Sequence, residues 1–179
     1  MENFLRLDEK FSAKLRLAED QTAWRKVAAF IAHTGDSWYL EFALLIIWLF
    51  STGDVHKYAA LLAGSIIIQA VLVLAIKFLI KRKRPEGDWG AVYRNADPHS
   101  FPSGHAARML MLSVIIFGLG CPMPGFVVLF WGLGVSFARV ALGVHFLSDL
   151  LGGWIIGIAL AQVILFAQPL FYNLFPFVF

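Results

Sequence analysis

The chain has 179 residues, of which 59% are apolar and only 15% are charged, and its net charge is +3. Soluble domains contain about 45–50% apolar and about 25% charged residues, so this composition excludes a disordered chain and an ordinary soluble enzyme and favours a polytopic membrane protein. The 17 Phe and 6 Trp residues suit a lipid-facing surface, and with so small a net charge no nucleic-acid partner is expected.

Residues 2–33 are predicted to form two interfacial helices. Apolar residues recur at spacings of three and four along the first of them, at Phe4, Leu7, Phe11, Leu15 and Ala18. With charged residues between them, this pattern is typical of an amphipathic helix on a membrane surface, although a helix in the cytosol would share it. A second short helix is expected over 22–33. No short apolar core closely follows Met1, so a cleavable signal peptide is not expected.

Five long apolar runs follow, at about 37–51, 58–80, 104–120, 124–142 and 146–168. A transmembrane helix needs roughly 17–25 residues. The sequence therefore predicts an all-α membrane bundle of about five transmembrane spans, with a core over 35–168 in a single domain over 1–179. Residues 85–103 form the one long polar loop, and no element is predicted in the apolar tail 169–179, which contains two prolines. Five spans place the connections 81–103 and 139–146 on the same side as the N-terminus.

The first polar motif on that side is Lys77 with Arg84. Seven residues make nearly two helical turns, so both side chains are expected on one face of a helix that Pro85 ends. Lys77 could instead simply extend to the lipid headgroups. The basic run 81–83 could be a positive stop signal or a patch for anionic lipid.

The second motif is Ser103-Gly104-His105, directly before an apolar run. Ser103 is a good helix N-cap, and Gly104 lets an anion approach the backbone closely. Free N–H groups at a helix start bind anions. His105 would stand beside that site, although a histidine here could also be an ordinary interfacial residue.

The third motif contains Arg139, His145 and Asp149. His145 and Asp149 are four residues apart, so the carboxylate is expected to accept a hydrogen bond from one imidazole nitrogen; a purely structural bond is the alternative. Gly143 allows a bend, so that Arg139 ends one span and His145 begins the next. The guanidinium of Arg139 suits a phosphate.

The three motifs together bring three cations, two histidines and one aspartate to one membrane edge. Converging cations repel one another unless they surround an anion, and a tetrahedral oxyanion has enough oxygens for all of them. Two histidines and one aspartate could bind zinc, but the neighbouring cations disfavour a dication. No metal and no cofactor are therefore expected.

These motifs resemble the three-part signature of the type 2 phosphatidic acid phosphatase superfamily, the lipid phosphate phosphatases. The ten matching positions are Lys77, Arg84 and Pro85, then Pro102, Ser103, Gly104 and His105, then Arg139, His145 and Asp149. The resemblance covers about residues 35–165. One position departs from the pattern, because the residue before the arginine is usually Ser but here is Ala138, with Ser136 two residues further back. A hydroxyl contact to the phosphate is then missing or supplied by Ser103.

The resemblance implies a metal-independent phosphohydrolase that works through a phosphohistidine. His145 would be the nucleophile, Asp149 its orienting partner, and His105 would protonate the leaving oxygen or assist the attack of water. The phosphoryl oxygens would be held by Lys77, Arg84, Arg139 and the backbone at Ser103 and Gly104. These residue types agree with the chemistry, since phosphoryl transfer needs charge stabilisation and two-step hydrolysis needs a nucleophile and a separate acid.

The implied substrate is a phosphorylated membrane lipid whose tail stays in the bilayer. Phosphatidic acid, phosphatidylglycerol phosphate, undecaprenyl pyrophosphate and lipid A 1-phosphate are the candidates. The alternative is a non-catalytic binder or transporter of anionic lipid, which would need the cations but not the histidines and the aspartate. The superfamily also resembles vanadium haloperoxidases, but those are larger soluble proteins, which the composition opposes.

A multi-pass protein of the bacterial inner membrane is expected, and the sequence does not indicate its oligomeric state. Of the 15 Lys and Arg residues, only Lys57 falls on the side opposite the motifs. The positive-inside rule thus places the motifs in the cytoplasm. Bacterial proteins that the chain resembles, however, often act on the outer face, so the two indications oppose each other.

Overall fold

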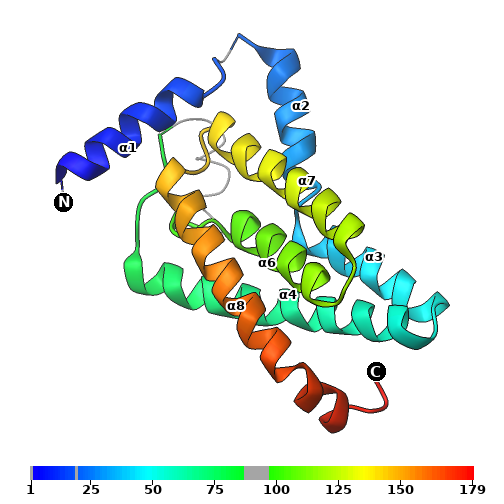
Figure 1. The fold of residues 1–179 in the computed structure, drawn as a ribbon. Helices are drawn as coiled ribbons and strands as arrows, with labels where there is room; N and C mark the ends of the chain where they lie inside the picture. The colour runs from blue at the N-terminus through cyan, green and yellow to red at the C-terminus, as the bar shows by residue number, and fades with distance from the viewer. Residues whose placement is uncertain (1, 19, 87–96) are drawn as a thin grey trace.

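The computed structural model describes residues 2–18, 20–86 and 97–179, and over these residues the fold is all-helical. Two N-terminal helices precede five apolar ones (Figure 1). The elements are α1 (Glu2–Leu15), α2 (Thr22–His33), α3 (Ser37–Phe50), α4 (Gly53–Ile80), α6 (Gly104–Gly118), α7 (Pro122–Ala141) and α8 (Leu147–Leu174). The all-α prediction is confirmed, whereas most of the predicted polar loop, residues 87–96, lies outside the described residues.

Within the described part of the chain, three helices are long and apolar enough to cross a membrane: α4, α7 and α8, with 28, 20 and 28 residues. Helices α3 and α6 are also apolar but have only 14 and 15 residues. All five coincide with predicted apolar runs, and the number of spans stays a prediction. Helix α8 continues through Pro169 to its end at Leu174, so half of the unassigned tail is helical. Membrane helices tolerate such an internal proline because neighbouring groups satisfy the freed backbone carbonyl.

Helix α6 lies at the centre of the bundle and packs against α4, α7 and α8 (Figure 1). Its contact with α8 is close because two glycines of α8 face its backbone. A Cβ added at Gly153 would lie 2.6 Å from the carbonyl oxygen of Ser103, and one added at Gly157 would lie 2.3 Å from that of Ala107. Small residues four apart let membrane helices approach in this way. The contact places the first turn of α6 beside the first turn of α8.

Helix α1 binds the bundle through its polar side. Asp8 and Ser12 are buried, whereas Leu7, Phe11 and Leu15 are each about half exposed. The Ser12 hydroxyl accepts a hydrogen bond from the N–H of residue 147 at 2.9 Å, and Asp8 accepts one from the N–H of residue 148 at 3.0 Å. Both bonds cap the start of α8, where N–H groups lack helical partners.

The amphipathic pattern predicted for α1 is thus confirmed at these three apolar positions. Ala18 lies beyond the end of the helix, and the side chain of Phe4 is outside the described structure. The polar face binds the protein and leaves the apolar face about half exposed, which suits a helix on a membrane surface. That α1 lies on the membrane stays a prediction.

Candidate active site

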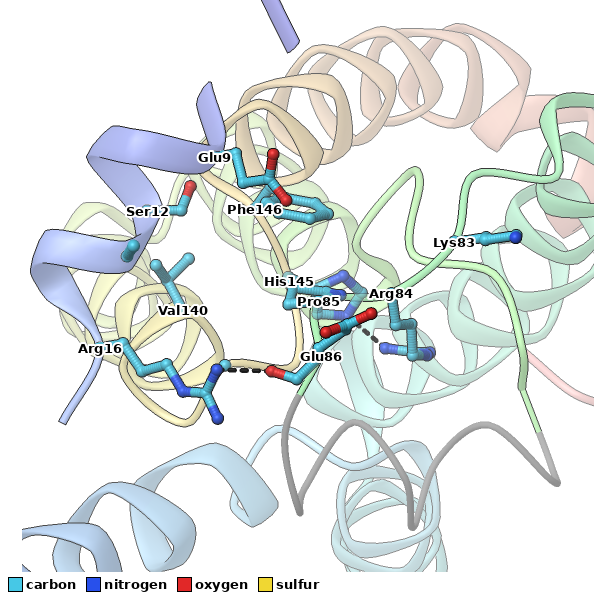
Figure 2. Close-up of a pocket in the computed structure, with 12 residues that line it drawn as sticks. Glu9, Ser12, Arg16, Lys83, Arg84, Pro85, Glu86, Val140, His145 and Phe146 are labelled. Carbon is cyan, nitrogen blue, oxygen red and sulfur yellow. Dashed lines mark hydrogen bonds between the residues drawn. The ribbon is translucent and has the colours of Figure 1, made fainter. Parts of the chain in front are cut away.

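The three sequence motifs meet at one end of the bundle, where α4 and α7 end and α6 and α8 begin. A pocket of about 430 Å³ opens there. Helix α1 forms one wall, and His145 and Arg84 lie next to each other on the opposite side (Figure 2). Arg16, directly after α1, and Lys83 add two more cations to the lining, which also contains Glu9 and Glu86.

Lys77 and Arg84 do not share a helix face, contrary to the prediction. Helix α4 ends four residues before Arg84, well before Pro85, because Lys81 adopts a left-handed conformation with φ 54°. The two cations come together through Asp97 instead. Lys77 Nζ donates to Oδ2 of this carboxylate, and Arg84 Nη2 donates to the same oxygen at 2.7 Å.

Asp97 is a site residue that the sequence analysis missed. Burial raises its pKa, but the positive charges and hydrogen bonds of Lys77 and Arg84 outweigh burial, so the pKa of Asp97 lies below its ordinary value of 3.8. Both cations are themselves buried, with 5% of each residue exposed. Two buried cations that share one carboxylate form an anion site. An acidic residue in a polar loop is ordinarily solvated, so nothing local pointed to Asp97.

Ser103 caps α6, as predicted. Its hydroxyl accepts a hydrogen bond from the N–H of Ala106 at 3.5 Å, and its own N–H donates to the carbonyl of Asp149 at 3.0 Å. Gln69 of α4 donates to the carbonyl of Gly104 at 3.3 Å. The first turn of α6 is therefore held by both α4 and α8.

His105 follows in the same turn but is not among the described residues that line the pocket of His145. Its Nε2 lies 2.6 Å from Oδ1 of Asp36, at the start of α3. The other oxygen of Asp36 lies 2.9 Å from Nδ1 of His33, at the end of α2. Neither Asp36 nor His33 was predicted, since both precede all three motifs.

His145 lies between α7 and α8 and is buried, with Nε2 3.4 Å from Arg84 Nη1 and Nδ1 3.4 Å from Asp149 Oδ2. Burial, followed by the positive charges of Arg84, Arg139 and Lys77, lowers the pKa of His145 well below its ordinary 6.5. Its imidazole is therefore neutral near pH 7. A neutral imidazole keeps the lone pair that a nucleophile needs.

The predicted hydrogen bond between His145 and Asp149 is not formed in this structure. Their 3.4 Å separation is an ion-pair distance, and Nδ1 of His145 has no hydrogen-bond partner in the described part of the chain. Asp149 instead accepts bonds from the N–H of Phe146 at 2.9 Å and from Arg82 Nη1 at 2.7 Å. A carboxylate in the first turn of a helix is well placed for such bonds.

Arg82 belongs to the run that was interpreted as a stop signal or lipid patch, yet it connects α1 to the site. Its Nη2 lies 2.6 Å from Oδ2 of Asp8, and its Nη1 donates to Asp149 at 2.7 Å and to the Ser148 hydroxyl at 2.5 Å. Its guanidinium also lies 4.2 Å from the ring centroid of Phe146. Arg82 therefore links Asp8 of the N-terminal helix to Asp149, the carboxylate that faces His145.

Two further polar residues near the motifs are held by bonds within the protein. Arg108 is buried and donates to the carbonyl of Gly35 at 2.5 Å. Ser136 donates to a backbone carbonyl of its own helix at 2.7 Å and accepts a bond from Trp154 at 3.2 Å. It therefore does not supply the hydroxyl that Ala138 lacks.

Metal ligands do not gather at the site. Among residues 2–18, 20–86 and 97–179, no three His, Cys, Asp or Glu side chains form a group that would hold a metal ion. The carboxylates of Asp97 and Asp149 are instead bound by arginine or lysine. Independence from metals stays a prediction.

Residues 58–171, which include all three motifs, match the family model of the PAP2 superfamily. The chain belongs to the PAP2 superfamily. It is 35% identical, over 106 residues, to the decaprenylphosphoryl-5-phosphoribose phosphatases of two Mycobacterium tuberculosis strains. This match covers 57% of the chain and 56% of each relative, so the chain spans little more than half the length of these PAP2 relatives.

The crystal structure of a transmembrane PAP2 type phosphatidylglycerolphosphate phosphatase from Bacillus subtilis has the same fold. The TM-score is 0.74 at 24% identity, and the match covers 92% of this chain and 85% of that protein. This likeness shows the fold, and three of the described helices are long and apolar enough to cross a membrane.

Proposed function

We propose that this protein is a lipid phosphate phosphatase that hydrolyses a phosphomonoester or pyrophosphate of a membrane lipid through a phosphohistidine at His145. The observation that carries the proposal is the anion site of Lys77 and Arg84 beside a neutral, buried His145. A phosphate in place of the Asp97 carboxylate would meet both cations and lie next to the nucleophile. The relatives named above are phosphatases, which supports this assignment.

In the proposed mechanism, Nε2 of His145 attacks the phosphorus, because Nδ1 faces Asp149. The bond from phosphorus to the leaving oxygen breaks, and His105 gives that oxygen a proton. The surrounding cations, with Arg139 among them, stabilise charge on the three remaining phosphoryl oxygens. Water then attacks the phosphohistidine and returns a proton to His105, so that inorganic phosphate leaves and the enzyme is restored.

The name of the mycobacterial relatives supports one class of substrate among those considered. Decaprenylphosphoryl-5-phosphoribose contains a terminal phosphomonoester on a sugar that a second phosphate joins to the lipid. Phosphatidylglycerol phosphate, one of the lipids considered from the sequence, likewise has a terminal phosphomonoester and a second phosphate that joins the headgroup to the lipid. Arg16 and Lys83 line the pocket beside Arg84 and provide charge for an inner phosphodiester. We therefore place lipids of this design ahead of phosphatidic acid, undecaprenyl pyrophosphate and lipid A 1-phosphate.

The test is phosphate release by purified protein from a panel of these lipids in mixed micelles, with and without a chelator. Activity that persists in chelator and is inhibited by vanadate is expected. Activity that chelator removes and magnesium or zinc restores would contradict metal independence. Binding of the lipids without release of phosphate from any of them would favour the non-catalytic binder.

A further inference from the structure

Asp36 lies outside the family match and outside all three motifs, yet it has the shortest polar contact to His105 among the described residues. Its Oδ1 lies 2.6 Å from Nε2 of His105, and its Oδ2 lies 2.9 Å from Nδ1 of His33. The carboxylate is mostly buried, with 21% of its side chain exposed. It thus joins the end of α2 to the first turn of α6.

The turn that carries Asp36 is held in place from two helices. Arg108 of α6 donates to the carbonyl of Gly35 at 2.5 Å, and Trp131 of α7 donates to the hydroxyl of Thr34 at 2.9 Å. Gly35 leaves no free space, because an added Cβ would lie 2.7 Å from a Val135 methyl group and 3.2 Å from the His105 ring. The contact between carboxylate and imidazole is therefore built into the packing.

The charges around this contact favour an ionised carboxylate. Burial raises the pKa of Asp36, but hydrogen bonds from His105 and His33 outweigh it and lower the pKa to about 2. The charged groups that act on His105 are Asp36, Arg139 and Arg108. Asp36 is the negative one of these three, so it is the group that favours the imidazolium which a proton donor must form.

A carboxylate bound to Nε2 also decides which nitrogen reacts. Since Nε2–H donates to Asp36, Nδ1 is the nitrogen of His105 that remains to give a proton to a leaving oxygen and to take one from water. The same arrangement of a carboxylate behind a histidine fixes tautomer and orientation in general acid–base catalysis.

We propose that Asp36 is a positioning residue for His105, which holds the ring in one tautomer and supports its protonated form during departure of the leaving group. This inference rests on the proposed phosphatase function. His33 holds the second oxygen of the carboxylate and so fixes the plane in which Asp36 meets the ring. The proton itself passes only between His105, the leaving oxygen and water, so the step balances without another donor.

Asp36→Asn keeps the size of the side chain and tests the inference. With a lipid phosphate, whose alkoxide is a poor leaving group, kcat is expected to fall about 10- to 100-fold with little change in KM, less than the roughly 10²–10⁴-fold effect of losing a general acid. With p-nitrophenyl phosphate, which needs no proton on its leaving oxygen, the first-turnover burst should remain. In a His105→Ala background, Asp36→Asn should have little further effect.

Asp54→Asn is the matched control, since Asp54 is an exposed carboxylate in the first turn of α4. It should retain normal kcat with both substrates. Normal kcat of Asp36→Asn with the lipid would overturn the inference, and so would loss of the p-nitrophenyl phosphate burst in a protein of unchanged melting temperature. If the unmodified protein releases phosphate from no lipid, the proposed function itself fails, which is a separate outcome.

Discussion

His145 and His105 are placed in different surroundings at the same end of the bundle. His145 has one nitrogen beside Arg84 and the other 3.4 Å from Asp149, whereas His105 is bound to Asp36 and is also acted on by Arg139 and Arg108. A cation favours a neutral imidazole, and a carboxylate favours an imidazolium. In the proposed mechanism, His145 takes the role of nucleophile and His105 that of acid.

The first prediction concerns these two residues. His145→Ala should abolish turnover and the trapped phosphoenzyme, because no other described group is placed to attack. His105→Ala should slow turnover by roughly 10²–10⁴-fold yet still form the phosphoenzyme from a substrate with a good leaving group. Acid-quench labelling with a radioactive substrate measures both quantities. A near-normal rate for His145→Ala would refute the role assigned to it.

The second prediction concerns Asp97, which holds the two buried cations in the absence of substrate. In Asp97→Asn, Lys77 and Arg84 lose their shared counter-charge, so vanadate and phosphate should bind more tightly while the melting temperature without ligand falls. Added phosphate should restore much of the melting temperature by binding the folded state. Unchanged vanadate inhibition would show that Asp97 does not occupy the phosphate position.

At the scale of elements, α1 has an apolar side and a polar side with different functions, and its sequence pattern alone does not show what the polar side does. Its apolar side is about half exposed, and its polar side caps α8 and reaches Arg82. Hydropathy predicted the helix and its apolar side because both depend on local spacing. Two partners of Asp8, Arg82 and Ser148, lie more than 70 residues away, so its role depended on the tertiary fold.

The third prediction therefore tests α1 through Asp8→Asn. Loss of the ion pair with Arg82 should destabilise the docked helix by about 1–3 kcal/mol, the cost of leaving a buried group partly unsatisfied. Faster proteolysis within α1 and lower phosphatase activity are expected together. Asp20→Asn, a change at an exposed carboxylate beyond the end of α1, should alter neither. Normal activity with a fully released α1 would separate the helix from the active site.

The end of α4 was predicted wrongly because it depends on contacts distant in sequence, whereas the features predicted correctly depend on local sequence. The apolar runs were predicted well because hydropathy is a local property, and the N-cap at Ser103 was predicted for the same reason. The helix was expected to reach Pro85, but Lys81 turns left-handed and the carbonyl of Arg82 pairs with the N–H of Ser100. Lysine does not favour that conformation, so distant contacts rather than local propensity end the helix.

At the scale of the whole molecule, the site, α1 and nearly all basic residues share one end of the bundle. Five of these cations are buried or partly buried at the site end, and they are Lys77, Arg82, Arg84, Arg108 and Arg139. Without them, eight Lys and Arg residues in the described part of the chain still lie at this end, against Lys57 at the other. The positive-inside rule continues to favour a cytoplasmic site.

The fourth prediction tests this orientation in a Cys121→Ser background, which has no native thiol. One variant carries Gln21→Cys at the site end, and a second carries Thr52→Cys at the other end; both positions are exposed. In intact cells, an impermeant maleimide should label the second variant and not the first. The reverse pattern would place the active site outside the cytoplasm, where bacterial proteins of this kind often act.

The glycine contact between α6 and α8 has a consequence for how this sequence can vary. Gly153 and Gly157 face backbone atoms that cannot move aside without shifting Ser103 and the start of α6. Ile155, between them in sequence, is 69% exposed. In a library that replaces each residue of α8 in turn, positions 153 and 157 should reject even alanine, whereas position 155 should accept any large apolar side chain. Mutational tolerance along one helix would then alternate between the two extremes every two residues.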